Sequence, residues 1–216
     1  MNNKESLCIQ SETIERWTKF AYLGSIIDNK GGTGADTTAR IQKAQSAFSA
    51  LSKIWHSVAY STQTKLHIFN TNVKAVLLYG CETWKNSKNI RVKLRGFINK
   101  CLRKLLRIFW PDQATNKELW KRTKQPRIDL QIRKRKWRWL GHTLRKPSDD
   151  ITRQALEWNL QGKWGRERPR KTWRRTVLEE AKGVTKTWAE NKTNAKNRVT
   201  WRILVKALRS AAALTK

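Results

Sequence analysis

The side chains in this sequence whose types and spacing suit chemistry are cations, and the chemistry is phosphate binding. Residues 87–108 fit one amphipathic helix, with apolar residues on one side and basic residues on the other: Lys93, Lys100, Arg103, Lys104 and Arg107. No acid lies between Glu82 and Asp112. A solvated helix surface usually mixes Glu with Lys in favourable i,i+4 pairs. Because this stripe forgoes them, we expect it to contact phosphates, with a merely solvated surface as the alternative.

Two more basic segments follow. In a helix predicted over residues 128–145, one side carries His142 and these cations: Arg127, Lys134, Arg138 and Arg145. A later loop combines glycines with Arg-Pro-Arg, which suits a chain lying in a groove, although the alternative is a plain connection into a helix over 170–182. In this loop we expect nucleic-acid contacts from Lys163, Trp164, Arg166, Arg168, Arg170 and Lys171. Most of the twelve Trp have core spacing, but Trp137 and Trp164 lie among basic residues and are candidates for stacking on bases.

No set of residues is spaced for catalysis or metal binding. Asp149 and Asp150 form the sole Asp-Asp pair, and because a helical pattern follows, we interpret them as helix N-cap residues ahead of Thr152. The three histidines are isolated, and His142 is expected on the surface. Cys8, Cys81 and Cys101 lack the CxxC spacing of a zinc site. We therefore expect no catalytic residue and no metal ligand in this chain.

The charge of the whole chain points to a polyanionic partner. Over 216 residues the formal net charge is +31 and the isoelectric point is about 10.9, an excess that raises self-repulsion unless a polyanion is bound. Hydrophobic residues make up 38% of the chain, enough for a packed core. The polar N-terminus and the absence of a run of roughly eighteen apolar residues predict neither a signal peptide nor a membrane span. We expect an intracellular protein of the nucleus and cytoplasm.

The periodicity predicts a mainly α fold. Residues 13–27 alternate as in a hairpin or a pair of short strands, and because two strands alone are marginal, we expect them to form the edge of a larger sheet outside this chain. Two helices follow, over 36–55 and from a cap at Ser61 to residue 80, and a short loop makes them antiparallel. Thr115 and Glu118 form a capping-box signature. In the last helix, over 187–209, Trp201 and Leu204 have core spacing.

These elements group into three predicted parts. Residues 1–34 hold the short N-terminal β-hairpin, residues 35–110 form a helical bundle, and residues 111–216 form a basic, Trp-rich helical C-terminal domain.

Five segments, taken in order, resemble the C-terminal part of reverse transcriptases of RTE-like non-LTR (LINE-type) retrotransposons. They are FAYLGSII at 20–27, LLYGCETW at 77–84, WRWLGH with LR at 137–145, RPRKTW at 168–173, and the last helix from Arg198 through Trp201-Arg202 to Leu208. The resemblance implies that the first segment is the primer-grip hairpin at the end of a palm, with Phe20, Tyr22, Leu23 and Gly24 as the primer-grip residues. It also implies that residues 36–110 form the thumb and that the rest lies past the polymerase.

The resemblance implies a nucleic-acid-binding fragment that holds an RNA template and its primer duplex through phosphate contacts. The palm carboxylates that would hold two metal ions should lie upstream of Phe20, where this chain has only a short polar stretch. We therefore expect no polymerase activity from this chain alone, and Mg²⁺ only in the missing palm. The expected partners are RNA, RNA–DNA hybrid or DNA duplex, and the missing fingers-palm and endonuclease parts of the same polyprotein, but no membrane. The alternative is a non-functional or host-adopted transposon remnant, at most a structural or scaffold protein.

Overall fold

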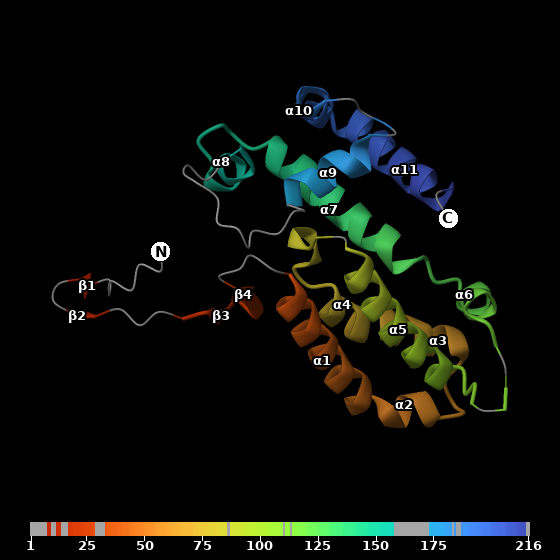
Figure 1. The fold of residues 1–216 in the computed structure, drawn as a ribbon. Helices are drawn as coiled ribbons and strands as arrows, with labels where there is room; N and C mark the ends of the chain where they lie inside the picture. The colour runs from red at the N-terminus through yellow and green to blue at the C-terminus, as the bar shows by residue number, and fades with distance from the viewer. Residues whose placement is uncertain are drawn as a thin grey trace.

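The structure is a computed structural model that describes residues 8–9, 12–13, 17–28, 33–85, 87–109, 111–112, 114–157, 173–182, 184 and 187–214. It is mainly helical with an N-terminal antiparallel hairpin, which confirms the predicted fold class (Figure 1). The strands are β1 (Cys8–Ile9), β2 (Glu12–Thr13), β3 (Lys19–Tyr22) and β4 (Ser25–Asp28). The helices are α1 (Gly34–Ala50), α2 (Ser52–His56), α3 (Thr62–Ile68), η1 (Phe69–Val73), α4 (Lys74–Leu77), η2 (Cys81–Thr83), α5 (Lys88–Leu105), α6 (Asn116–Thr123), α7 (Ile128–Leu144), α8 (Ile151–Glu157), α9 (Trp173–Ala181), α10 (Trp188–Lys196) and α11 (Arg198–Leu214).

Strands β3 and β4 form the predicted hairpin, with Tyr22 opposite Ser25 across a two-residue turn. The turn residues Leu23 and Gly24 have positive φ angles of 47° and 78°. Positive φ at both central positions matches the right-handed twist of the strands, which is why such turns close tight hairpins. A second pair, β1 with β2, is also antiparallel.

The hairpin is fixed to the first helix by buried polar side chains. The Asp36 carboxylate on α1 accepts a hydrogen bond from the Ile26 backbone N–H at 3.0 Å and another from Trp84 Nε1 at 2.7 Å. Arg40, one turn later, donates to Ser25 Oγ at 3.3 Å and stacks over the Tyr79 ring. A buried acid and a buried cation therefore connect β4, α1 and the end of α4.

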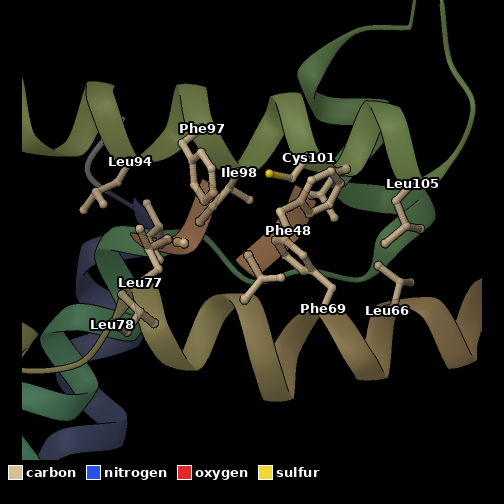
Figure 2. Close-up of a cluster of buried hydrophobic side chains, with 14 of the residues drawn as sticks. Phe48, Leu66, Phe69, Leu77, Leu78, Leu94, Phe97, Ile98, Cys101 and Leu105 are labelled. Atoms are coloured by element: carbon tan, nitrogen blue, oxygen red, sulfur yellow. The ribbon is translucent and has the colours of Figure 1, made fainter. Parts of the chain in front are cut away.

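The first hydrophobic cluster lies between α1, the continuous helix formed by α3, η1 and α4, and α5 (Figure 2). Phe48 on α1 packs edge-on against Phe69 of η1, while Arg40 at the start of α1 meets Tyr79 beyond α4. The two helical segments therefore run antiparallel, as predicted. Across from them, α5 contributes the apolar face expected from its period, and the cluster members from that face are Ile90, Leu94, Phe97, Cys101, Leu105 and, just beyond the helix, Ile108.

Side-chain caps define several helix starts. The Ser61 side chain accepts from the Thr64 N–H, which confirms the predicted cap of α3. Thr115 and Glu118 form the predicted capping box of α6, with both reciprocal hydrogen bonds present. Each cap satisfies backbone N–H groups that the first helical turn leaves without a partner.

The second hydrophobic cluster joins α7 to α9, α10 and α11. Trp201 of α11 packs at a tilt against Trp137 of α7, with ring centroids 5.6 Å apart, and donates its indole N–H to the Trp137 carbonyl at 2.8 Å. Glu180 of α9 accepts hydrogen bonds from Lys136 Nζ at 2.7 Å and from Trp137 Nε1 at 2.9 Å. These contacts fix α9 and α11 on α7 (Figure 1).

Helix α7 belongs to both clusters, because Ile128 and Ile132 lie in the first and Trp137 and Leu140 in the second. The division at residues 34 and 110 stays a prediction. Among the described residues, no helix is both long enough and apolar enough to cross a membrane.

Candidate nucleic-acid interface

The basic side of α5 faces away from the first cluster. Lys93, Lys100 and Lys104 are exposed there, whereas the next residues in sequence after the first two, Leu94 and Cys101, turn inward and are buried. We call these three side chains the α5 lysine stripe. They form an exposed, positively charged surface on which a phosphate backbone can lie.

The two arginines predicted for the same stripe have structural partners. Arg103 is half-buried and donates to the Ala114 carbonyl at 3.2 Å and to Asn116 Oδ1 at 2.9 Å. Arg107 is exposed and donates to the His56 carbonyl. Both guanidinium groups therefore hold neighbouring segments in place, so their removal would alter the fold as well as the charge.

Helix α7 carries the second predicted set of cations. Arg127 precedes the helix and makes two hydrogen bonds to the Asp129 carboxylate, at 2.8 and 3.2 Å, so its charge is paired. Arg138 is exposed, and Lys134 and Arg145 are half-buried. These last three side chains lie along one side of α7.

The structure adds a second row of cations that the sequence analysis did not select. Arg198, Arg202 and Lys206 lie on α11, and hollows in the surface between α7 and α11 bring the two rows together. One hollow of about 270 Å³ lies between Lys134, Arg138, Arg202 and Lys206. The next, of about 330 Å³, shares Arg138 and Arg202 with it and adds Arg145 and Arg198.

Because the two neighbouring hollows share the side chains of Arg138, Trp201 and Arg202, we treat them together and call them the α7–α11 groove. Its cations are Lys134, Arg138, Arg145, Arg198, Arg202 and Lys206. None of the described residues lining these two hollows is acidic. At the end marked by Arg145 and Arg198, the groove opens into a larger hollow of about 830 Å³, which is lined by Lys146, Arg153, Lys192 and Lys196.

The cations in the groove repel one another. Partial burial, together with the charges of Arg198 and Arg202, lowers the pKa of the Arg145 guanidinium from its ordinary value. Arg145 also donates to the Ala195 carbonyl at 3.1 Å, which fixes it in this position. A bound anion would relieve this repulsion, because opposite charges at a partly buried site interact more strongly than in open solvent.

The base-stacking prediction for Trp137 is wrong. Its side chain is 0% exposed and its indole N–H is bonded to Glu180, so no base can reach the ring. The remaining residues of the predicted loop lie outside the described part of the chain: Lys163, Trp164, Arg166, Arg168, Arg170 and Lys171. Exposed His142 lines the α7–α11 groove, and its position on the surface confirms that prediction.

The predicted primer-grip residues lie in strand β3 and in the turn that follows it. Phe20 and Tyr22 are exposed and meet edge to face, with ring centroids 6.5 Å apart. Leu23 is 74% exposed in the turn, and the Gly24 carbonyl accepts a hydrogen bond from Lys43 at 3.2 Å. The hairpin thus presents an aromatic surface, and its primer-grip role stays a prediction.

Asp150 caps α8 by accepting from the Thr152 N–H at 2.9 Å, which confirms the N-cap interpretation, and the Thr152 hydroxyl lowers the Asp150 pKa to about 2. Burial raises the pKa of Cys81 and Cys101 to about 12, so both thiols stay protonated. The described part of the chain holds no group of three His, Cys, Asp or Glu side chains that could bind a metal ion.

The row of cations on α11, which forms the second wall of the groove, is visible as a pattern in the sequence. Arg198, Arg202 and Lys206 recur every four residues on α11, on a face that adjoins the buried one formed by Trp201, Leu204, Val205 and Leu208. This is the same one-sided pattern as on α5, and applying that criterion to the last helix would have found it.

Residues 47–79, from the end of α1 to just beyond α4, match a family described as a domain of unknown function (DUF6451). No curated protein and no solved structure matches the chain.

Proposed function

We propose that this chain binds nucleic acid through its phosphate backbone, as the C-terminal part of an RTE-like retrotransposon reverse transcriptase that holds the RNA template and primer duplex. The observation that carries the proposal is the α7–α11 groove, where six cations face one depression with no acidic lining residue among those described. A folded protein gains nothing from crowding like charges unless an anion neutralises them. The α5 lysine stripe provides a second surface of the same sign.

The chemistry of both surfaces favours contact without sequence readout. Lys and Arg contacts to phosphate set position and affinity, whereas base edges specify sequence. A duplex that contains RNA adds 2′-hydroxyl groups across its wide, shallow minor groove, and these distinguish it from DNA. Among double-stranded ligands, we therefore propose that RNA duplex and RNA–DNA hybrid bind more strongly than duplex DNA.

The proposal extends to the rest of the polyprotein. The exposed aromatic tip of the hairpin would contact the primer end, and Mg²⁺ would be bound by the palm carboxylates that the resemblance places before Phe20. The fingers-palm and endonuclease parts would be protein partners, and the protein would act inside the cell, in the nucleus and cytoplasm.

The test is a titration of the full chain with labelled RNA–DNA hybrid, RNA duplex, DNA duplex and heparin. The matched variants each replace three lysines by Gln. One removes Lys93, Lys100 and Lys104, and the control removes the exposed Lys53, Lys117 and Lys182 on other elements. We expect the stripe variant to lose about tenfold or more in affinity for hybrid and the control variant to lose much less.

Shape recognition separates this function from general attraction to polyanions. A surface fitted to A-form geometry should prefer hybrid over heparin of matched charge by about tenfold or more, because groove-shape and 2′-hydroxyl contacts persist when salt screens charge. Equal affinity for hybrid, DNA duplex and heparin at every salt concentration would contradict the proposal and leave the transposon-remnant interpretation.

A further inference from the structure

We infer that the α7–α11 groove binds a single strand of nucleic acid, separately from the duplex on the α5 lysine stripe. This inference rests on the proposed function and assigns a ligand class to one of its two surfaces. It implies that the chain recognises a junction, where a duplex continues into an unpaired template strand.

The width of the groove carries the first step. Helices α7 and α11 are in direct contact, because Gly141 leaves room for Trp201 and the Trp201 indole bonds to the Trp137 carbonyl at 2.8 Å. Helices packed in this way have axes about 8–10 Å apart, so the depression between them is only as wide as side-chain rows on adjacent helices allow. A duplex, whose major groove alone is about 12 Å wide, would rest on the ridges and not in the depression.

The length and charge of the groove carry the second step. Lys134 and Arg145 on α7 are separated by about 16 Å at 1.5 Å per residue, and the α11 row from Arg198 to Lys206 spans about 12 Å. One strand laid along this length would place several phosphates between the two rows of cations. Cations on both walls can then neutralise one backbone from two sides.

The burial of the Trp201 ring at the bottom of the groove favours binding of a sugar-phosphate backbone there over stacking of a base. Trp201 lines the hollows but is only 3% exposed, and its ring lies against Trp137. Arg138 and Arg202 are exposed at the rim, where they reach phosphate without leaving the helix surface. The groove therefore contacts charge along the strand and leaves its bases outward, available for pairing.

The experiment uses fluorescence anisotropy with the full chain and three RNA-containing probes: a blunt RNA–DNA hybrid, the same hybrid with a six-nucleotide single-stranded RNA extension, and an isolated RNA strand of eight nucleotides. The groove variant replaces Arg138, Arg202 and Lys206 by Gln, all exposed side chains. The α5 stripe variant and the three-lysine control described above complete the set. Circular dichroism confirms that each variant keeps its helical content.

We expect the extension to increase affinity of the unaltered chain for the hybrid by about tenfold or more. The groove variant should lose this gain and bind the isolated strand at least tenfold more weakly, while its affinity for blunt hybrid stays within about twofold. The stripe variant should show the opposite pattern.

Three results would overturn the inference. The extension could add nothing, the groove variant could weaken blunt and extended hybrid by the same factor, or the groove and stripe variants could behave alike. In each case the chain still binds nucleic acid, so the proposed function survives and only the strand assignment is lost. Failure of the unaltered chain to bind any probe would instead reject the proposed function itself. If the groove variant loses helicity, crosslinking of a photoreactive uridine in the extension decides: crosslinks to α7 and α11 support the assignment, and crosslinks confined to α5 reject it.

Discussion

At the scale of single residues, the contact between α7 and α11 depends on Gly141. A Cβ atom built at this position would lie 2.0 Å from Trp201 Nε1, which is closer than two non-bonded heavy atoms can approach. We expect Gly141→Ala to lower the free energy of unfolding by about 1–3 kcal/mol, because overpacking outweighs the better helix propensity of Ala. Urea unfolding followed by circular dichroism measures the change.

Gly96 on α5 provides the matched control for this substitution. It is exposed, and a Cβ there would meet nothing within 4 Å. Gly96→Ala should therefore stabilise the protein by about 0.5–1 kcal/mol through helix propensity alone. Equal effects of the two substitutions would mean that Trp201 does not pack against Gly141 as the structure has it.

A second residue-scale prediction concerns Lys74, which is buried with its ammonium 2.6 Å from Gln125 Oε1. Burial, and then the charge of Arg135, lowers the pKa of Lys74 to about 8. Between this value and the ordinary Lys pKa of about 10.4, the unfolded chain holds a proton that the folded chain has released. The free energy of unfolding should therefore rise with pH in this window, by about 1.4 kcal/mol per pH unit for this one group, and stay flat below pH 8.

The comparison with Lys74→Gln isolates this group from the other lysines that titrate in the same range. The difference in unfolding free energy between the unaltered chain and the variant should change in favour of the unaltered chain as pH rises from about 8 to 10. A difference that stays constant with pH would show that Lys74 titrates normally.

Residue-scale reasoning from sequence failed where neighbours in the chain point in different directions. Trp137 was selected because Lys136 and Arg138 flank it, but on a helix Lys136 and Trp137 both turn towards α9 while Arg138 turns to solvent. Lys136 is itself 0% exposed, paired with Glu180. Composition around a residue cannot reveal that orientation, since it depends on which helix packs on which side.

At the scale of elements, Glu180 fixes α9 on α7, and its loss should be costly. Without this carboxylate, the buried Lys136 ammonium has no counter-charge. Removing one partner of a buried ion pair lowers the free energy of unfolding by about 3–5 kcal/mol. We expect Glu180→Ala to destabilise the protein by about that amount in urea unfolding. Adding Lys136→Met should restore part of the loss, because it removes the unpaired ammonium. Arg133 Nε, 3.8 Å from the Glu180 carboxylate, and the Trp137 indole N–H still lose their partner in the double variant. Additive losses in the double variant would contradict the pairing.

Elements were the level at which the sequence was most informative. The apolar side of α5 and the caps at Ser61 and Thr115 were predicted correctly, because helical period and capping depend on residues within one or two turns. The hairpin was also predicted. Its tight turn at Leu23 is less evident from sequence, because a non-glycine residue with positive φ is uncommon.

At the scale of the whole molecule, the α7–α11 groove could not be predicted, because it depends on how distant segments pack. Arg145 and Arg198 lie on helices that pack together through the second hydrophobic cluster, around Trp137 and Trp201. Each row of cations is visible in the sequence, but their convergence is a tertiary fact. The high net charge, by contrast, gives a whole-molecule expectation that needs no structure.

That expectation is a steep dependence of binding on salt. If the α5 lysine stripe and the α7–α11 groove together neutralise on the order of six to ten phosphates, affinity for an extended hybrid should fall roughly a thousandfold or more between about 50 and 200 mM salt. The slope of log affinity against log salt concentration should be steeper than about −5. Removing either three-residue set should reduce the magnitude of this slope by about two to three, because binding with fewer phosphate contacts releases fewer counterions. The three-lysine control variant should keep the slope of the unaltered chain, because Lys53, Lys117 and Lys182 lie outside both surfaces. If all three variants flattened the slope equally, the charge would act as a diffuse field, and neither the stripe nor the groove would be a defined phosphate-binding surface.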